Sequence, residues 1–584
     1  MMQFERPAVS LLCILCGALI FFLIAHWPSL TNPYVIDDDV RQQIFWMQQW
    51  NDPELFQNDI LTGYARNYVP WGVQAIYYAG SAFMNPVQFT KVVTGILFVV
   101  TAGLLFVLGL QFRHPRAPVI IVCASFFFTG FVMKISGGLS QSFAFPLLLA
   151  YLIFLGRDNL LGCGIVILLQ SVLNPYIFLL SVVTHAFYLS FNYAPALFES
   201  IWKRPSPTAV ARANPLTNPD AELPGPRAND PSGGLSIFTR LLLVNLPVIA
   251  GVFLMFLKYV VLNHADLGGL VTRAAMQGNP EYTAAGRYEL MPAPSFLFEL
   301  VRPFELSLPL GGTYWFIGWL IIAIIIASIV YAFTRPDKKV DLAGFRVFGY
   351  LLPASVVMFI LASLLYMKLF LPGRYLEFSL TLFYCTALGI AFTIIPEYIP
   401  LVRKAFFLLV FLCIVLGGVR HYTVGIYDYS ADAPLYEFLE TTPKTSLVAG
   451  PPELMDNCMT FGRRKAFVTH ELSHTWTDKF WEIMKKRTFD FFDAYYAEHP
   501  EEIREFARSY GIDYLVVREA DLSPESMKTG RVYFEPFGAY IRAKAGITSH
   551  FAALDEKAFP IVYRKDGIRV LKIGPGSPPA ARGL

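Results

Sequence analysis

The chain has 584 residues, of which 55% are hydrophobic and 16% charged, and its mean hydropathy is +0.47. Too few polar side chains remain to cover a water-soluble globule of this size, so the apolar excess must face lipid. A formal net charge of +3 is too small to indicate nucleic-acid binding. The composition therefore predicts an α-helical polytopic membrane protein.

Eleven apolar runs predict helical spans, because a transmembrane helix needs about 20 mainly apolar residues. They cover residues 9–27, 87–110, 117–133, 142–156, 160–173, 175–191, 241–262, 314–333, 347–367, 378–395 and 405–419. Asn174-Pro175 divides what would otherwise be one long run, since proline cannot continue a helix. The stretch 72–84 is short and amphipathic, so we expect it to lie at the membrane interface.

Lysine and arginine are concentrated in alternate connecting loops, and such loops stay on the cytoplasmic side. These basic residues are Arg6, Arg113, Arg116, Arg157, Lys203, Arg204, Arg212, Arg227, Arg240, Arg335, Lys338, Lys339, Arg346, Arg403 and Lys404. The loops between them are longer in total yet poorer in basic residues. With an odd number of spans, this pattern predicts a cytoplasmic N-terminus and an external C-terminal tail.

The spans divide the chain into a transmembrane module over residues 1–419 and an extracytoplasmic domain over 420–584. Within the module we expect a first external loop at 28–86, a disordered cytoplasmic loop at 192–238 that is rich in Pro, Ala and Asn, and a second external loop at 263–312. The tail contains short β-like runs, namely SLVAGPP, RKAFVTH, DYLVVRE, FPIVYRK and IRVLKI, separated by helical stretches. This alternation predicts a small α/β domain.

The most polar feature beside the membrane follows the first span directly, where Asp37, Asp38 and Asp39 stand next to one another, shortly before Arg41. Three adjacent carboxylates repel one another, so a cation, a metal ion or an arginine must offset their charge. On the outer face they could accept a proton from an acceptor hydroxyl or hold a divalent cation against a lipid-linked phosphate. The alternative is a solvated acidic turn that caps the next helix. Asp59 is a further acidic residue of this loop.

Aromatic residues are frequent in or beside the same loop. They are Phe45, Trp46, Trp50, Tyr64, Tyr68, Trp71, Tyr77 and Tyr78. Their faces could stack on sugar rings or on an isoprenoid chain, while the alternative is an amphipathic interfacial helix that lies on lipid.

The order of these elements resembles the GT-C superfamily of polyprenyl-phosphate-dependent membrane glycosyltransferases. The resemblance rests on an external loop that opens with Asp37, Asp38 and Asp39 after the first span, on an amphipathic helix, and on the element Tyr68-Val-Pro70-Trp-Gly72 before the second span. In the tail, residues 510–517 and 559–571 look like strand motifs of the extracytoplasmic domain that ends many such enzymes. A GT-C-like helical module with a small α/β domain is the fold that this resemblance implies.

The resemblance also implies a reaction and a location. A sugar would be transferred from a polyprenyl-phosphate-linked donor to a glycan, lipid or protein acceptor, on the outer face of the cytoplasmic (inner) membrane of a bacterium. One of Asp37, Asp38 and Asp39 would be the catalytic base. Asp38 and Asp39 would be the candidate ligands of a divalent metal ion, Mg or Mn.

Negative charge develops on the leaving phosphate as the glycosidic bond breaks, so the reaction needs a cation beside it. Arg374 is the first candidate, because it lies in a Pro-Gly-Arg turn at the outer ends of two spans and an arginine fork matches a phosphate. The alternative is an interfacial arginine that snorkels beside Tyr375. The other candidate substrate-binding residues are Arg41, Asp59 and Lys134.

The segment His470-Glu471-Leu472-Ser473-His474 formally matches the zinc-protease pattern, in which two histidines one helical turn apart bind zinc and the glutamate is the base. That pattern requires a helix, but residues 464–469 are typical of a strand that runs straight into it. No third ligand is evident. We therefore interpret His470, Glu471 and His474 as a chance match and do not expect zinc.

Two other interpretations stay open. A transporter or lipid flippase would place the same acidic residues along a translocation path, although such proteins hold charges or broken helices near mid-membrane and often show repeated halves. Charges within the predicted spans are scarce here. Only Lys91 and Lys258 come close to such a position, and both lie near the outer ends of their spans. A catalytically inactive GT-C-like scaffold would instead bind a partner in cell-envelope assembly.

Overall fold

A computed structural model describes most of the chain. The described residues are 7–194, 237–263, 267–290, 295–305, 307, 314–334, 341–366, 368–369, 371–394, 406–529 and 533–574. The predicted disordered loop at 192–238 lies almost entirely outside them.

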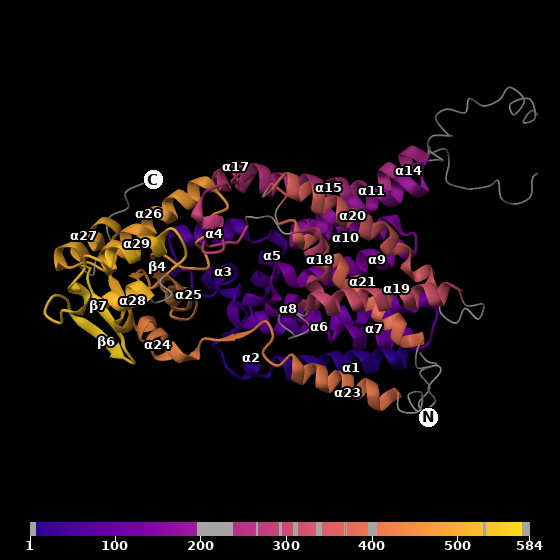
Figure 1. Ribbon diagram of the computed structural model, residues 1–584, viewed down its shortest axis with the longest axis horizontal. Coiled ribbons are helices and arrows are strands. Elements are labelled where there is room, and N and C mark those ends of the chain that lie inside the picture. Colours follow the sequence, from indigo (N-terminus) through magenta and orange to yellow (C-terminus); the bar gives the residue numbers. More distant parts are fainter. Residues whose placement is uncertain are drawn as a thin grey trace, which may run out of the picture.

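Helices form one end of the elongated molecule and a mixed α/β region forms the other (Figure 1). The long or apolar helices are α1 (Pro7–Ala25), α6 (Pro86–Gly109), α7 (Ala117–Ser125), α8 (Thr129–Ile135), α9 (Ala144–Gly156), α10 (Leu160–Leu173), α11 (Pro175–Asn192), α14 (Ile237–Val244), α15 (Leu246–Phe256), α19 (Tyr314–Thr334), α20 (Arg346–Leu364), α21 (Gly373–Ile394) and α23 (Phe406–Arg420). Each of the eleven predicted runs coincides with one or more of these helices.

The number of spans is not confirmed. Among the described residues, four helices are long and apolar enough to cross a membrane: Pro7–Ala25, Pro86–Phe112, Leu342–Leu364 and Gly373–Thr393. The pair Ala117–Ser125 and Thr129–Gly138, bent by 79°, makes a fifth if it counts as one span. Five further apolar helices have 10 to 17 residues, which is short for a span. The fold is that of a multi-pass membrane protein.

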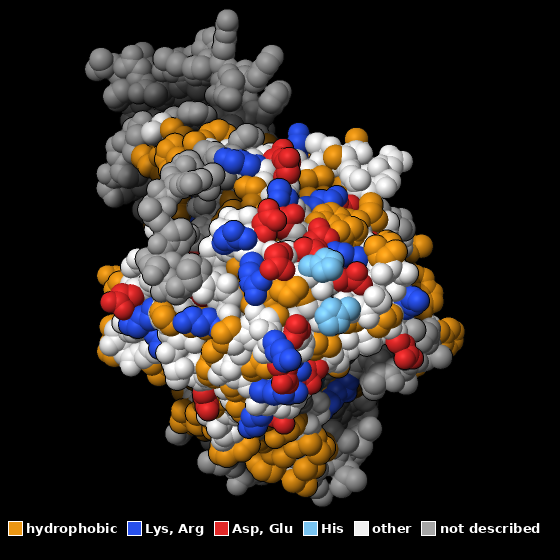
Figure 2. Space-filling model, turned by 90° about the vertical axis from the view of Figure 1, so that its left-hand side faces the viewer, with side chains coloured by type: hydrophobic (Ala, Val, Ile, Leu, Met, Phe, Trp, Pro, Cys, Tyr) orange, Lys and Arg blue, Asp and Glu red, His pale blue; other side chains and the backbone are white. Residues whose placement is uncertain are grey.

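The surface of the helical end supports this description. Large apolar side chains face outward there, with Leu12 63%, Phe253 62% and Phe316 72% exposed. The opposite end, formed by the C-terminal region, carries interspersed acidic and basic side chains (Figure 2). The apolar surface of the helical end is typical of contact with lipid, and the charged surface of the C-terminal region is typical of contact with water.

Asn174 accounts for the predicted break between two of the apolar runs. Helix α10 ends at Leu173 and α11 begins at Pro175. The Asn174 side chain accepts hydrogen bonds from the backbone N–H groups of Tyr176 (3.1 Å) and Ile177 (3.2 Å). Asparagine as the N-cap and proline at the first helical position together start a new helix.

The segment that we predicted as the first external loop is folded, and residues 40–48 within it are buried throughout. Its elements are α2 (Trp27–Thr31), β1 (Val35–Ile36), α3 (Val40–Gln43), η1 (Phe45–Trp50), α4 (Ile60–Tyr68) and α5 (Trp71–Ser81). The second external loop contains α17 (Arg273–Met276), η6 (Pro280–Tyr282) and α18 (Phe296–Glu305). Helix α5 covers the stretch that we predicted to lie at the membrane interface.

The C-terminal region contains all five predicted strands, in one sheet. They are β3 (Leu447–Ala449), β4 (Lys465–Ala466), β5 (Tyr514–Arg518), β6 (Ile561–Lys565) and β7 (Ile568–Lys572), in the order β4-β3-β5-β7-β6. The pairs β3–β4 and β3–β5 are parallel, while β7 is antiparallel to β5 and β6. The helices of the region are α24 (Ala433–Thr441), α25 (Pro452–Phe461), α26 (Asp478–Tyr495), α27 (Pro500–Tyr510), α28 (Pro524–Thr529) and α29 (Phe537–Lys544). The continuous apolar run in β5 explains its central place in the sheet.

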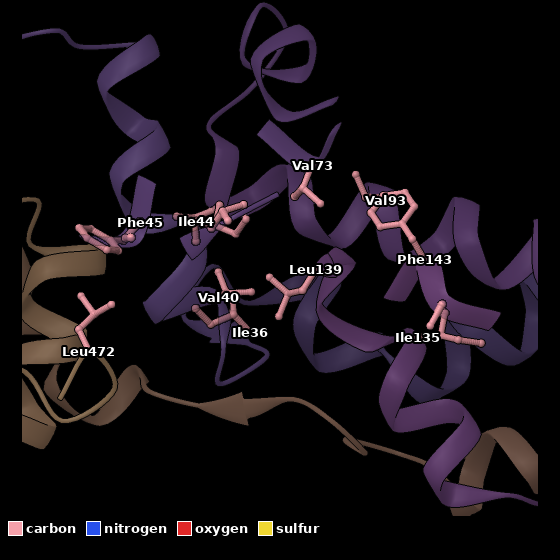
Figure 3. Close-up of a cluster of buried hydrophobic side chains, with 14 of the residues drawn as sticks. Ile36, Val40, Ile44, Phe45, Val73, Val93, Ile135, Leu139, Phe143 and Leu472 are labelled. Carbon is pink, nitrogen blue, oxygen red and sulfur yellow. The ribbon is translucent and has the colours of Figure 1, made fainter. Parts of the chain in front are cut away.

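A second, two-stranded sheet joins the two ends of the molecule. Strand β1 pairs antiparallel with β2 (Tyr427–Asp428), which follows the last helix of the membrane part. Buried hydrophobic side chains continue the junction: Phe45 of the first loop lies beside Leu472 of the C-terminal region (Figure 3). The first external loop is therefore fixed between the helices and the C-terminal region, and this was not predicted.

Candidate active site

The acidic run begins immediately after β1, so the β1–β2 pairing sets its position. Asp37 is buried and its Oδ1 accepts the backbone N–H of Asp39 at 3.0 Å. Gly137 lies against this turn with a φ of +86°, and a Cβ atom there would come within 2.7 Å of the Asp37 Cγ. Glycine is required at that position, both for its backbone angle and for the close approach. The segment between α8 and α9 thus closes over the acidic run.

Asp38 is engaged by two groups. Its carboxylate forms an ion pair with Arg41 and accepts a hydrogen bond from the Tyr429 hydroxyl at 2.8 Å. The Arg41 guanidinium also lies over the Tyr429 ring, 4.3 Å from its centroid. The positive charge that the sequence predicted to offset the acidic cluster is therefore Arg41, and it neutralises Asp38 in particular.

Arg41 connects the loop to the C-terminal region. It donates a hydrogen bond to Asn457 Oδ1 at 2.9 Å and lies 3.6 Å from the Glu471 carboxylate. Glu471 is also paired with Arg287 of the second external loop at 3.3 Å. The Asp456 carboxylate accepts the backbone N–H of Glu471 at 3.1 Å. Three segments far apart in the sequence are thus held together by charge-assisted contacts.

Burial raises the pKa of Glu471 from 4.5 to about 7, and the Asp38 carboxylate adds to the rise, while Arg287 and Arg41 oppose it. The folded protein therefore keeps a proton that the unfolded chain releases between pH 4.5 and pH 7, and its stability falls as pH rises through this window.

The variant Glu471→Gln lacks this titration. Its free energy of unfolding minus that of the wild type should rise from pH 4.5 to pH 7, by up to about 1.4 kcal/mol per pH unit. Urea unfolding of the purified full chain, followed by tryptophan fluorescence, measures it.

Glu501 provides the control for this experiment, because its side chain is 73% exposed on α27. Glu501→Gln is measured in the same way and serves as the reference for removal of a surface carboxylate. If Glu471→Gln differed from the wild type by the same free energy at every pH from 4.5 to 7, Glu471 would not titrate in this range.

Asp39 faces cations that come from distant parts of the chain. Gln141 donates a hydrogen bond to its Oδ2 at 3.3 Å, and its carboxylate interacts electrostatically with Arg374, Lys134 and Arg287. Burial nevertheless raises the pKa of Asp39 above its usual value. Burial, together with the neighbouring carboxylates of Asp39 and Asp38, raises the pKa of Asp37 well above the usual range. Of the three aspartates, Asp39 is the one placed to accept a proton beside positive charges.

Lys134 and Arg374 are held in place by buried partners. The Lys134 ammonium is 3.3 Å from the Glu377 carboxylate, and both side chains are about 10% exposed. The Arg374 guanidinium lies over the Tyr176 ring, 5.4 Å from the centroid. Two cations in one half-buried site can stabilise an anion such as a phosphate.

Asp59 is placed elsewhere. It is the N-cap of α4, and its carboxylate accepts the backbone N–H of Thr62 at 2.8 Å. Its electrostatic partners are Arg487 and Lys465 of the C-terminal region. The structure does not bring it to Asp39, so its evident role is to cap a helix.

Asparagine caps a helix as well as aspartate does, whereas alanine does not. Asp59→Asn should therefore leave the thermal stability almost unchanged, and Asp59→Ala should cost about 1 kcal/mol. Both variants should keep the sugar transfer that the resemblance implies, because the structure places Asp59 away from Asp39. Loss of turnover in a stable Asp59→Asn protein would restore the predicted substrate-binding role.

The segment with the zinc-protease pattern is not helical. Residues 470–474 form an irregular turn between β4 and α26. Glu471 is held by two arginines, and His474 Nδ1 lies 2.7 Å from the Tyr64 hydroxyl. The pattern therefore lacks the geometry that a zinc protease needs.

The donor set for the predicted divalent cation is limited. In the part of the chain that the structure describes, no group of three or more His, Cys, Asp and Glu side chains could hold a metal ion. Of the two predicted ligands, Asp38 is already neutralised by Arg41. The residues present thus do not fit a metal centre, and the identity of any metal is not established.

The sequence reasoning missed several residues of this site. Glu377 lies three positions after Arg374, and an ionisable residue at the start of an apolar helix is the signal that could have revealed it. Arg287 belongs to a loop whose spacing specified no ligand, and Glu471 was interpreted only as part of a chance match to the zinc-protease pattern. Gln141 and Tyr429 carried no signal, because nothing in the sequence indicates that they lie beside the aspartates.

No model of a known protein family and no curated protein sequence matches the chain. In three dimensions it is similar to ArnT from Cupriavidus metallidurans, solved bound to undecaprenyl phosphate, with 12% identity, a TM-score of 0.49 and coverage of 97% of this chain and 99% of that one. It is also similar to the archaeal oligosaccharyltransferase AglB from Archaeoglobus fulgidus, solved with an inhibitory peptide and a dolichol-phosphate (12% identity, TM-score 0.47, coverage 88% and 70%). An A. fulgidus oligosaccharyltransferase structure with Zn and sulfate gives a TM-score of 0.45, again at 12% identity, with coverage of 89% and 68%. These proteins are members of the GT-C superfamily that the sequence resembles.

Proposed function

We propose that the chain is a membrane glycosyltransferase that moves a sugar from a polyprenyl-phosphate-linked donor to an acceptor hydroxyl or amide. One observation carries the proposal: Asp39, Lys134 and Arg374, which are separated by 95 to 335 positions in the sequence, interact electrostatically in one half-buried site. A proton acceptor next to fixed cations is the arrangement that transfer from a lipid-linked phosphate requires.

In the proposed reaction, Asp39 accepts the proton of the acceptor group as its oxygen or nitrogen attacks the anomeric carbon of the sugar. The bond between that carbon and the phosphate oxygen breaks, and the electron pair leaves with the phosphate. Arg374 and Lys134 stabilise the negative charge that develops there. Gln141 orients the Asp39 carboxylate through its hydrogen bond.

Other charged residues position Asp39 and its two cations. Glu377 holds the Lys134 ammonium. Arg41 offsets the charge of Asp38, so that Asp39 does not lie beside an unpaired Asp38 carboxylate. Glu471 and Arg287 keep the C-terminal region closed over the first loop. In this proposal the transmembrane module spans residues 1–419, and the domain at 420–584 lies with the active site on the outer face of the cytoplasmic membrane.

The direct test is donor turnover. The purified full chain in lipid nanodiscs is incubated with a panel of radiolabelled decaprenyl-phosphate monosaccharides, and release of decaprenyl phosphate is measured with and without membrane extract as the source of acceptor. Turnover of at least one donor, lost in Asp39→Asn, supports the proposal. Binding without turnover for the whole panel would contradict it and favour the transporter or scaffold interpretations.

A further inference from the structure

The segment 469–477, which carries the zinc-protease pattern, lies between the two external loops. The backbone N–H of Val271 donates to the Trp476 carbonyl at 2.9 Å, and the Tyr282 hydroxyl donates to the Thr475 carbonyl at 2.8 Å. Leu270 and Thr477 form an isolated antiparallel bridge. These contacts fix the segment against the second external loop, so its side chains have defined positions.

Four aromatic side chains meet there, and we call Tyr68, Tyr288, His474 and Trp476 the aromatic cluster. The His474 ring stacks on Trp476 with centroids 4.2 Å apart and an interplanar angle of 19°. Tyr68 and Tyr288 lie 5.8 Å and 5.3 Å from Trp476. His474 is fully buried, whereas Tyr68, Tyr288 and Trp476 keep part of their surface exposed. Three aromatic faces thus surround a buried imidazole at the junction of three segments.

The cluster contains polar ring nitrogens that the protein does not use. His474 Nδ1 lies 2.7 Å from the Tyr64 hydroxyl, which leaves Nε2 as the second hydrogen-bonding atom of the ring. This Nε2 and the Trp476 Nε1 are buried and have no hydrogen-bond partner among the residues that the structure describes. Buried polar groups of this kind are normally satisfied, because leaving them unpaired is costly.

The cluster adjoins the proposed reaction site. The Tyr68 and Tyr288 hydroxyls each interact electrostatically with both Asp39 and Arg374. A ligand on the cluster would therefore extend toward the proton acceptor and the phosphate-binding cation.

We propose that the aromatic cluster is a carbohydrate subsite that binds a neutral monosaccharide ring. The apolar C–H face of the sugar stacks on the partly exposed rings. One sugar hydroxyl hydrogen-bonds to His474 Nε2, and another accepts a hydrogen bond from Trp476 Nε1. This inference rests on the proposed function in one respect: the sugar bound here is taken to be the one transferred from the lipid-linked donor.

Binding of free sugars tests the subsite without requiring turnover. The full chain in nanodiscs is titrated with methyl glycosides of mannose, glucose, galactose, N-acetylglucosamine and arabinose, with saturation-transfer NMR as the readout. At least one glycoside should bind the wild type. Trp476→Leu, which removes both the ring and the N–H, should weaken that binding by about tenfold or more, and Trp476→Phe, which keeps a ring, should weaken it less. Trp27→Leu is the matched control, because Trp27 is 56% exposed on α2 and distant in sequence from the cluster.

Decaprenyl phosphate, measured in parallel, separates this inference from the proposed function. Retained decaprenyl phosphate binding in Trp476→Leu, together with lost glycoside binding, supports the subsite and shows that the variant is folded. If Trp476→Leu does not fold, Trp476→Phe gives the comparison.

Absence of glycoside binding to the wild type, or equal binding by wild type and Trp476→Leu, overturns the subsite even if donor turnover is found. Selective loss of decaprenyl phosphate binding in Trp476→Leu overturns it as well and assigns the cluster to the isoprenoid chain. Failure of donor turnover with glycoside binding intact would instead refute the proposed function alone.

Discussion

Replacing Asp39 by Asn should reduce sugar transfer by about 10²- to 10⁴-fold while the protein stays folded. The amide has nearly the shape of the carboxylate and can still accept the Gln141 hydrogen bond, but it cannot take the acceptor proton. The loss should therefore appear in kcat, with donor binding retained. Single-turnover transfer from the donor identified in the nanodisc assay measures it.

Two further variants make this result specific. Asp37→Asn should lose much less activity, because the raised pKa of Asp37 means that the native side chain is more often protonated, and asparagine resembles that form. Asp52→Asn is the control for a charge change in the same loop, since Asp52 pairs with Lys444 at the surface. An Asp39→Asn enzyme with wild-type transfer would refute the assignment of the base.

The pH dependence provides a second check on Asp39. Because burial raises its pKa above the usual value for aspartate, transfer should decline on acidification at a higher pH than for an exposed carboxylate. The acidic side of the plot of transfer rate against pH reports the titration of a group that must be deprotonated in order to accept a proton.

Replacing Arg374 by Gln should reduce transfer by about 10²- to 10³-fold, since a fixed cation beside a leaving phosphate commonly contributes this much. Glutamine keeps much of the length of the side chain but removes the charge and the fork of donors. Arg374→Lys should recover part of the rate, because the positive charge remains while the two-pronged geometry is lost. Rates and decaprenyl phosphate affinity are measured together.

Arg113 supplies the matched control, because its side chain is 81% exposed and lies 3.4 Å from the Asp341 carboxylate, away from the residues of the proposed site. Arg113→Gln should leave both rate and affinity within about twofold of the wild type, as for most surface substitutions. If Arg374→Gln behaved in the same way, Arg374 would be the interfacial arginine that the sequence left open as an alternative.

Much of the secondary structure could be predicted from the sequence. Each of the five β-like runs of the tail became a strand, and α10 and α11 separate at the Asn174-Pro175 break. These features depend on local properties, namely apolar patterning, caps and proline stereochemistry. Span number was less predictable, because several helices are short and the sequence does not show whether α7 and α8 form one bent span.

Among the site residues, local sequence identified the acidic run and the Pro-Gly-Arg turn. It could not distinguish the three aspartates, because their difference lies in their partners: Arg41 and Tyr429 engage Asp38, while Gln141 contacts Asp39. It also could not show that Asp59 caps a helix instead of joining the site.

By itself, the sequence determined that this protein has a membrane-embedded helical part, a water-facing α/β region and an acidic loop after its first helix, because composition and hydrophobic periodicity act locally along the chain. Only the tertiary structure decided which charges meet. The pairing of β1 with β2 and the contacts of Glu471 bring residues hundreds of positions apart into one site. Such contacts depend on how buried surfaces fit together, and no single segment encodes them.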